Sequence, residues 1–438
     1  MAGCIHRLRD RSDVLDGIID DLGDKMVKKH KLLKKKAAPA AAAADGGAAA
    51  APEKATDELQ NLAHVALPNQ EHVTVVGRVC LDGREGKLNA SSVLLEGSRE
   101  TSNGSRVALD LSATEEFSLF PGQIIAAEGT NTTGTVFTPQ VVYQGTALPM
   151  SRTRPDAFIE HYFTGDDEGA EVIDILVAAG PFTTNQDLTY TPLDDLLDVI
   201  RRDPPDAVIL MGPFVPEDHP MVKDADLDIT YEEFFEQVIG KISDVVVGEL
   251  KTCELILVPS LKDVSHDRVY PQPPFQLAEE LAENPRIHTM SNPATFTVKE
   301  VTVGLTTSDV LFDLTKAETS RGQSGDRMGR LANHVLTQRS YCPIVPAPLG
   351  LNVEYEQYEH LQLPVSPDVM ILPSELRHFV KNVNGSLVVN PGKLTKHGNG
   401  GTFTKLAIHA PRRIDIPEGD RPIPHGVASR TVAQVIRV

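Results

Sequence analysis

The residues best suited to metal chemistry in this sequence lie in one short run, Asp263-Val264-Ser265-His266-Asp267. Carboxylate oxygens and imidazole nitrogens are the ligands of two-metal hydrolases, so this run could hold a cation. Such a site needs ligands from several strand ends, and one loop cannot hold two ions about 4 Å apart. We therefore interpret the run as a surface loop, whose carboxylates cap a turn and whose histidine bonds to the backbone. A residual metal site is the alternative.

The surrounding pattern predicts a scaffold that brings several strand ends together. Three apolar runs, Val172–Ala179, Ala207–Met211 and Leu255–Val258, each end abruptly in a loop-forming run. Between them lie Leu193–Arg202 and Tyr231–Leu250, whose apolar residues recur at helical spacing. Alternating strands and helices indicate a parallel sheet covered by helices, and ligands of such sheets bind beyond the carboxyl ends of the strands.

The loops at these strand ends hold almost none of the required ligands. They contribute Gly180, Pro181 and Phe182, then Gly212, Pro213 and Phe214, then Ser260, Leu261, Lys262 and Asp263. The one carboxylate, Asp263, follows a lysine that would repel a cation. Ser260 and the later Ser374 do not lie in a G-x-S-x-G elbow, so we do not interpret either as a nucleophile. We predict loops without catalytic residues, metal or cofactor.

Several strings resemble the B-subunit family of DNA polymerase alpha. They are, in order, VAAGPFTT, ILMGPFV, LVPSLKDVSHDRVYPQPPF, LPVSPDVMILPSELRHFVK and VNPGKLTK, and the resemblance runs from about Ile5 to the C-terminus. The larger domain of that family is similar to calcineurin-like metallophosphoesterases and looks catalytically inactive. The resemblance implies a two-layered sheet flanked by helices, joined to an OB-fold β-barrel domain and an N-terminal helix.

Set against the motifs of active phosphoesterases, the chain lacks their ligands. D-x-H, G-D-x-x-D and G-N-H-D are replaced by Ala179-Gly180-Pro181, by Gly212 to Pro216, and by Ser260-Leu261-Lys262-Asp263. The late G-H-x-H is replaced by Pro373-Ser374-Glu375-Leu376, while the turn Asn390-Pro391-Gly392 is kept. The resemblance thus implies four vestigial active-site loops. We expect the rings of Phe182 and Phe214 to fill the space that ions and water occupy in active relatives.

The function that the resemblance implies is that of a non-catalytic accessory subunit of the nuclear DNA polymerase alpha–primase complex. It would bind the C-terminal region of the catalytic subunit and work beside the primase subunits during synthesis of RNA–DNA primers. The alternative is an active metallophosphoesterase with shifted ligands. Family members usually carry a small helical domain ahead of this region, which we do not find, so contacts of that domain are not carried over.

Composition sets outer limits on these interpretations. The 438 residues are 41% apolar and 24% charged, which suits a globular protein of two domains, and we find no secretory leader or membrane span. The four cysteines, at 4, 80, 253 and 342, show no paired spacing, which argues against a disulfide framework or zinc site.

The net charge of −19 is unevenly distributed along the chain. Residues 1–36 hold ten Lys or Arg against six Asp, a balance of +4. The rest of the chain holds 32 Lys or Arg against 55 Asp or Glu, a balance of −23. Such an acidic body favours protein partners, and we expect direct DNA binding to be weak or absent.

The pattern divides the chain into four segments. Residues 1–36 are predicted to form a helix whose second half, Lys25–Lys36, is rich in lysine. This half is a nuclear-import signal, an electrostatic contact or the solvated face of the helix, and we favour the last. Residues 37–60 form an alanine-rich linker, and residues 61–150 an OB fold. The barrel strands are expected at 72–81, 91–95, 106–111, 123–129, 135–137 and 140–143. Phe117 and Phe120 are expected to pack rather than to stack on bases.

Residues 151–438 are assigned to the inactive phosphoesterase-like domain. Its later strands are expected at 295–305, 308–312, 368–372, 385–389, 402–408 and 431–438, with a helix at 326–337. These strands should close the second layer of the sheet.

Overall fold

The computed structural model describes residues 2–37, 62–83, 86–163, 172–224, 228–323, 325–396, 398–417 and 419–438. The linker expected at 37–60 therefore lies outside the described residues except for its first one. By its internal contacts the chain divides into two units. One comprises residues 1–147 and 314–348, and the other residues 148–313 and 349–438.

The first unit is built on a closed barrel with strand order β1-β2-β3-β6-β5. The strands are β1 Asn69–Leu81, β2 Val93–Glu96, β3 Arg106–Leu109, β5 Ile124–Asn131 and β6 Val136–Tyr143, with the short helix α2 Arg99–Ser102 after β2. The two strands expected at 135–137 and 140–143 are one strand, β6, in which Pro139 lies at a register shift against β5. Phe117 and Phe120 are buried, as expected from the sequence.

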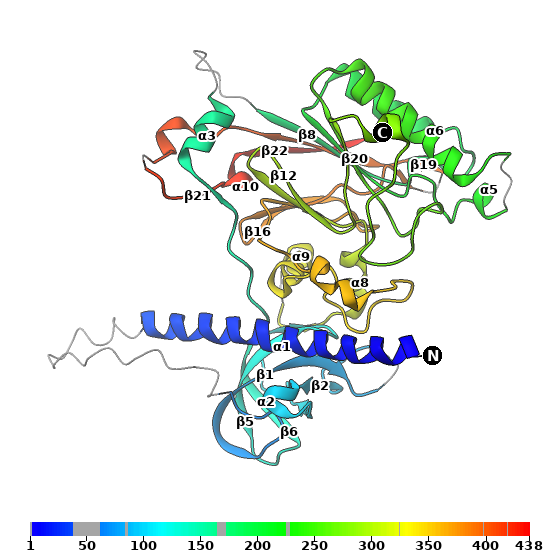
Figure 1. The fold of residues 1–438 in the computed structure, drawn as a ribbon. Coiled ribbons are helices and arrows are strands. Elements are labelled where there is room, and N and C mark those ends of the chain that lie inside the picture. The colour runs from blue at the N-terminus through cyan, green and yellow to red at the C-terminus, as the bar shows by residue number, and fades with distance from the viewer. Residues whose placement is uncertain are drawn as a thin grey trace. The chain divides into compact units, whose positions relative to one another are not determined.

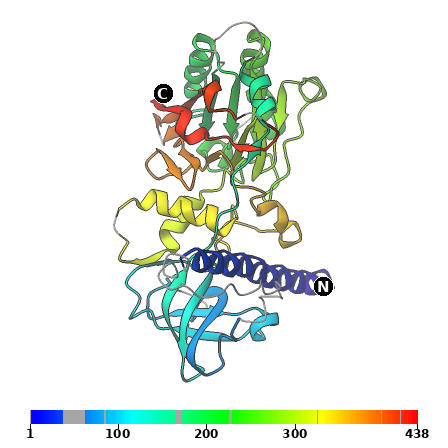
Figure 2. The same cartoon turned by 90° about the vertical axis from the view of Figure 1, so that its left-hand side faces the viewer.

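Helix α1, Ala2–Ala37, lies across the barrel strands β1 and β5 (Figures 1 and 2). Its buried residues Ile19, Leu22 and Met26 form a cluster with Val76 and Ile124 of these strands. The predicted helix is confirmed, and its buried residues lie three or four positions apart, so they form one apolar stripe that faces the barrel. Lys25, Lys28 and Lys29 are exposed, which agrees with a solvated face over the part of the lysine run whose side chains are described.

Gly23 is the point of closest approach between α1 and the barrel. A Cβ atom at Gly23 would overlap the side chain of Val76, whereas one at Gly17 would meet nothing within 4 Å. We therefore expect Gly23→Val to displace α1 from the barrel and to speed its cleavage in limited proteolysis. Gly17→Ala is the matched control, which should leave cleavage unchanged or slower because alanine stabilises helices. Equal cleavage of the two variants would contradict this packing.

The segment 314–348 packs with the barrel, although the sequence analysis assigned it to residues 151–438. Its strand β14, Thr319–Arg321, pairs with β4, Phe117–Leu119. Helix α9, Arg327–Gln338, follows, and Gln338 bonds both the N–H and the C=O of Ile124 at 2.8 and 3.0 Å. These pairings join positions about 200 residues apart, which no local sequence pattern indicates.

A buried polar cluster holds this segment in place. Ser118 donates to Glu318, and Arg330 Nε donates to the same carboxylate at 2.7 Å. His334 Nε2 lies 2.8 Å from Ser118 Oγ. Because the hydroxyl hydrogen goes to Glu318, we infer that His334 donates to Ser118 from Nε2. Burial opposes ionisation of Glu318, but these hydrogen bonds outweigh it and hold the pKa of Glu318 well below its usual value.

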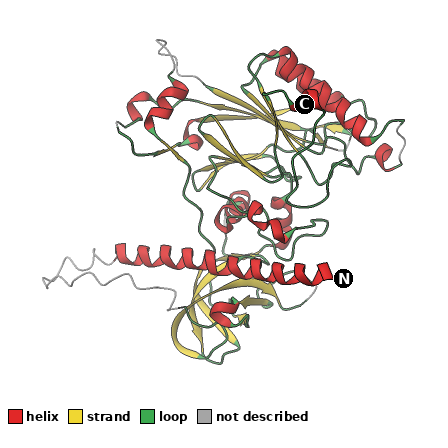
Figure 3. Cartoon of the chain, viewed as in Figure 1, coloured by secondary structure: helices red, strands yellow, loops and turns green. Residues whose placement is uncertain are grey.

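The second unit contains two sheets (Figure 3). The six-stranded sheet has the order β11-β10-β9-β8-β20-β22 and comprises β8 Ile173–Ala179, β9 Ala207–Met211, β10 Glu254–Val258, β11 Ile287–Thr289, β20 Thr402–Ile408 and β22 Thr431–Arg437. The five-stranded sheet has the order β12-β13-β15-β17-β16 and comprises β12 Ala294–Val298, β13 Val301–Leu305, β15 Val369–Ile371, β16 Phe379–Val383 and β17 Ser386–Asn390. The parallel pairing of β8, β9 and β10 confirms the predicted sheet.

Helices cover the outer face of the six-stranded sheet, and the other face packs on the second sheet. The helices that pack on the outer face are α4 Thr191–Arg202, α5 Pro220–Lys223, α6 Tyr231–Ser243, which continues as the π-helix Asp244–Glu249, and α7 Glu279–Ala282. Helices α3 Pro155–Tyr162 and α10 Val427–Arg430 contribute instead to the core between the sheets. Leu193 of α4 and Ile239 of α6 pack in one core with Leu176 and Val208 of the sheet. Ile175 and Ile209 point the other way and pack with Val303 and Val369. This confirms the predicted fold class, a two-layered sheet flanked by helices beside a small barrel.

Short elements complete the second unit. They are the strand pairs β7 Arg152–Thr153 with β21 Ile423–Pro424 and β18 Thr395–Lys396 with β19 Asn399–Gly400, and the 3-10 helices Tyr355–Leu361 and Arg413–Asp415. In the part of the chain that is described, no helix has the length and apolar character needed to cross a membrane.

Three expectations for the second layer were wrong. Residues 308–312 begin a helix, α8 Val310–Ala317, because Leu311 and Leu314 are buried on one helical face and Asp309 accepts from Phe312 N at 3.0 Å as an N-cap. Residues 295–305 form the hairpin β12–β13, which turns at Lys299 with φ 51°. Strands β20 and β22 extend the first sheet rather than closing the second, since β20 pairs with β8.

Candidate functional site

The three loops singled out in the sequence lie at one edge of the six-stranded sheet. They follow β8, β9 and β10, which are adjacent and parallel. The carboxyl ends of parallel strands are where such sheets bind ligands, so this edge is where catalytic groups would be expected. The fourth loop, Pro373–Glu375, follows β15 of the other sheet.

Two stacked phenylalanine rings fill the space beyond β8 and β9. Phe182 and Phe214 are each 0% exposed, and their ring centroids lie 5.0 Å apart with an interplanar angle of 15°. Phe275 and Phe235 meet Phe214 edge-on at 5.6 and 6.1 Å. Offset aromatic pairs of this kind add to the stabilisation that burial provides. The strand ends are thus occupied by a packed aromatic cluster.

The one carboxylate of these loops, Asp263, is turned inward. Its side chain is buried, and it accepts hydrogen bonds from the backbone N–H groups of Phe214 at 2.5 Å, Val215 at 3.1 Å and Ser260 at 2.9 Å. Burial raises the pKa of Asp263 to about 7, against the opposing effect of these three donors. Asp263 therefore ties the second loop to the third, and its oxygens are used within the protein.

Three further residues, which no sequence motif indicated, form hydrogen bonds to the backbone of these loops. Tyr190 OH donates to the carbonyl oxygen of Phe214 at 2.6 Å, and Thr395 Oγ1 donates to those of Pro181 and Thr183 at 2.9 and 2.8 Å. Gln272 Nε2 donates to the Ser260 carbonyl at 3.1 Å. A Cβ at Gly180 would overlap the Pro213 carbonyl, so the first two loops touch through their backbones. No motif or regular spacing includes these donors, so they could not be identified from the sequence.

The two serines of the site cap local turns. Ser260 Oγ accepts from Lys262 N at 3.3 Å, and Ser374 Oγ accepts from Leu376 N at 3.1 Å. No histidine or carboxylate among the described residues bonds to either hydroxyl, so the geometry supplies no base for a nucleophile. Glu375 is exposed, and its N–H donates to Asp309 at 2.8 Å. Pro373 is buried, and the side chains of Leu261 and Lys262 lie at or near the surface.

The run from Asp263 to Asp267 does not converge on one point. His266 Nε2 lies 2.8 Å from the Pro273 carbonyl oxygen, and its ring packs 4.9 Å from that of Phe275. The imidazole thus bonds to the backbone, as interpreted from the sequence, but Asp263 is buried rather than at a surface turn. Over the described ranges, no group of three or more His, Cys, Asp or Glu side chains is arranged to hold a metal ion.

The kept turn supports the fourth loop. Asn390 Oδ1 accepts from Ser374 N at 3.0 Å and from Gly392 N at 2.9 Å. Gly392 has φ 76°, a left-handed conformation in which glycine is favoured. The asparagine and the glycine of this turn thus both have a structural role.

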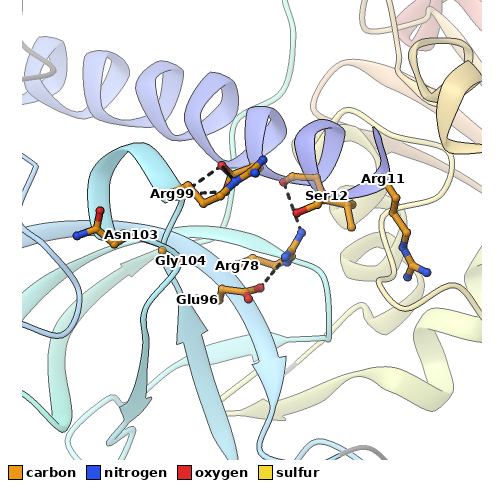
Figure 4. A pocket seen from close by; sticks show the side chains of 10 residues that line it. Arg11, Ser12, Arg78, Glu96, Arg99, Asn103 and Gly104 are labelled. Atoms are coloured by element: carbon orange, nitrogen blue, oxygen red, sulfur yellow. Dashed lines mark hydrogen bonds and ion pairs between the residues drawn. The ribbon is translucent and has the colours of Figure 1, made fainter. Parts of the chain in front are cut away.

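A polar pocket of about 480 Å³ lies between α1 and the barrel in the first unit. Figure 4 shows Arg78 turned toward Glu96, and Arg99 toward α1. Arg78 Nη2 lies 2.5 Å from Glu96, and Arg99 Nε lies 2.9 Å from Asp16. Arg106 binds the other oxygen of Glu96 at 2.9 Å. Arg78 and Arg99 are thus paired with carboxylates within the protein, which leaves them less able to hold a phosphate backbone.

Comparison with known proteins places the chain in a family. The model of the DNA polymerase alpha/epsilon B subunit matches residues 175–381, and that of the OB domain of the DNA polymerase alpha B subunit matches residues 53–145. The DNA polymerase alpha B subunit of Schizosaccharomyces pombe is 32% identical over 391 residues, with 86% of this chain and 67% of that protein covered. The chain belongs to the B-subunit family of DNA polymerase alpha.

Two mammalian members of this B-subunit family share a higher identity with the chain than the Schizosaccharomyces pombe protein does, but the chain covers a smaller share of their length. The mouse protein is 41% identical over 368 residues, with 83% of this chain and 59% of that protein covered. The rat protein is 39% identical over 386 residues, with 87% of this chain and 61% of that protein covered. The chain thus spans about 60% of these two relatives.

Two solved structures show a distant likeness to this chain. A novel archaeal phosphodiesterase is 12% identical with a TM-score of 0.26, over 57% of this chain and 99% of that chain. Vacuolar protein sorting 29 from Cryptosporidium parvum is also 12% identical with a TM-score of 0.26, over 61% of this chain and 98% of that chain. Likeness at this level does not bear on function.

Proposed function

We propose that this chain is a non-catalytic accessory subunit of the DNA polymerase alpha–primase complex. It binds the C-terminal region of the catalytic polymerase subunit and couples that subunit to the primase subunits during synthesis of RNA–DNA primers. It acts in the nucleus, where replication takes place. Membership of the B-subunit family of DNA polymerase alpha supports the assembly into which we place the chain.

The non-catalytic role is supported by one observation: the side chains at the strand ends contact and bond to other groups of the protein. The rings of Phe182 and Phe214 stack where substrate and ions would have to enter, and Asp263 is bonded to three backbone N–H groups. A hydrolytic metal site needs open coordination positions and several converging ligands. No contact described at these loops favours the alternative of an active metallophosphoesterase with shifted ligands.

Charge supports a protein partner over DNA. The chain carries a net charge of −19, and Arg78 and Arg99, which line the pocket beside α1, are paired with carboxylates. Non-specific DNA affinity comes largely from unpaired Lys and Arg that displace counterions. The barrel is therefore better suited to bind protein, and any contact with the template would be indirect.

The test is co-expression with the C-terminal region of the DNA polymerase alpha catalytic subunit, followed by gel filtration. We expect the two chains to elute together as a stable complex. The equivalent region of the DNA polymerase epsilon catalytic subunit is the matched control and should elute separately. Separate elution of two folded chains in the alpha experiment would contradict the proposal, and binding to both would contradict its specificity.

A further inference from the structure

Strand β22 forms one border of the six-stranded sheet. It pairs with β20 alone, antiparallel and without a break from Thr402 opposite Arg437 to Ile408 opposite Thr431 (Figure 1). Within the described residues, no other strand pairs with it. Its second edge is therefore not used in the sheet.

The register determines which backbone groups point to that edge. Val438 N donates to Gly401 O at 3.1 Å, and His409 N donates to Arg430 O at 2.9 Å. Hydrogen-bonded pairs alternate along an antiparallel ladder, so Val432, Gln434 and Ile436 also bond to β20. The N–H and C=O groups of Ala433 and Val435 point the other way, and no described residue bonds to them.

The edge lacks the features that usually protect such strands. Soluble proteins shorten edge strands, place lysine or proline in them, or twist them with a bulge. β22 has seven residues, TVAQVIR, with regular register and no lysine or proline. By contrast β11, at the opposite border, has three residues, and the edge strand β16 carries Lys381 at its centre. The side chain of Val432 is 50% exposed.

We propose that this free edge accepts an extended segment of the catalytic polymerase subunit as an additional strand. The proposal rests on the proposed function, which supplies the partner. An open edge with alternating donors and acceptors is the standard template for strand addition. The segment would be about six residues long, with apolar side chains at every second position. Ala433 lies at the rim of the core between the sheets and is only half-buried, so apolar side chains of an added strand would pack beside it and extend that core.

A second copy of this chain fits the edge less well. Seven residues extend over roughly 23 Å, and pairing two such strands buries well under the roughly 1,000 Å² that a specific interface needs. Two chains of net charge −19 would also repel each other. A segment of a partner already bound elsewhere gains from its high effective concentration, so a short strand suffices.

Residue-resolved amide hydrogen exchange on the free chain and on the complex tests this proposal. We expect the amides of Ala433 and Val435 to exchange fast in the free chain and roughly tenfold or more slowly in the complex. The amides of Val432, Gln434 and Ile436 bond to β20 and are the internal control, protected in both. A complex in which Ala433 and Val435 exchange unchanged would overturn this proposal alone. Failure to form the complex would overturn the proposed function as well.

A pair of variants tests the same edge by affinity. Ala433→Pro removes one outward N–H and blocks the approach of a strand, but leaves the ladder to β20 intact. We expect about tenfold or greater loss of affinity for the catalytic-subunit region, while Ala433→Val, which keeps the N–H, binds as the natural chain does. Equal binding by a folded Ala433→Pro chain would overturn the proposal. If that variant does not fold, the exchange measurement decides.

Discussion

Phe214→Asp should lower the free energy of unfolding by more than about 4 kcal/mol, with a matching fall in melting temperature. Truncating a buried phenylalanine costs about 3–5 kcal/mol, and an unpaired carboxylate in its place adds a desolvation cost. Phe214 is fully buried and contacts the rings of Phe182, Phe235 and Phe275. Chemical denaturation monitored by circular dichroism measures the change.

The matched control keeps the site apolar. Phe214→Leu should cost less than about 2 kcal/mol, because the side chain still fills most of the space without burying a charge. An unaltered melting curve for Phe214→Asp would mean that the ring lies at the surface. The strand ends would then be open to substrate and ions, contrary to the packing of Phe182 on Phe214.

Asp263→Ala should cost about 3–5 kcal/mol. The change leaves the N–H groups of Phe214, Val215 and Ser260 buried without an acceptor, and each unsatisfied group costs about 1–3 kcal/mol. Lys262→Ala, one residue earlier and exposed, is the matched control and should lie within about 0.5 kcal/mol of the natural chain. Similar stabilities for the two variants would show that Asp263 does not hold the loops together.

The cost of Asp263→Ala should also depend on pH. The pKa of Asp263 is raised from 3.8 to about 7 in the folded chain, so the folded state binds its proton more tightly than the unfolded state. Its contribution to stability is therefore complete below pH 4 and is lost as the pH rises through 7, by at most about 1.4 kcal/mol per unit. Unfolding at pH 6 and pH 8 should show the larger difference between the two chains at pH 6. A larger difference at pH 8 would contradict the raised pKa.

Local patterns predicted the parallel core because its signals are local. The apolar runs at β8, β9 and β10 and the helical spacing in α4 and α6 come from residues close in sequence, and each element formed where expected. The error at 308–312 has the same origin. A short apolar run there suits either a strand or a helix, and the cap provided by Asp309 decides for α8.

The arrangement of segments depends on contacts between distant residues and could not be predicted in this way. Residues 314–348 join the barrel through the pairing of β14 with β4 and through the buried bonds of Glu318. At the candidate site, the sequence alone shows that the loops at 180–182, 212–214 and 260–263 contain a single carboxylate and no histidine. The bonds that hold these loops in place could not be predicted, since the hydroxyls of Tyr190 and Thr395 reach the loop carbonyls without belonging to any motif.

The most direct test of this account is the metal content of the purified chain. Manganese, iron and zinc would be offered during preparation, weakly bound metal dialysed away and the remainder measured by elemental analysis, with Asp263→Ala prepared in parallel. Because the oxygens of Asp263 are bonded to backbone N–H groups, we predict close to no metal per chain in both preparations. One or two tightly held ions in the natural chain, lost in Asp263→Ala, would contradict the non-catalytic role. They would show that the loops at the strand ends form a metal site, as the alternative of an active metallophosphoesterase requires.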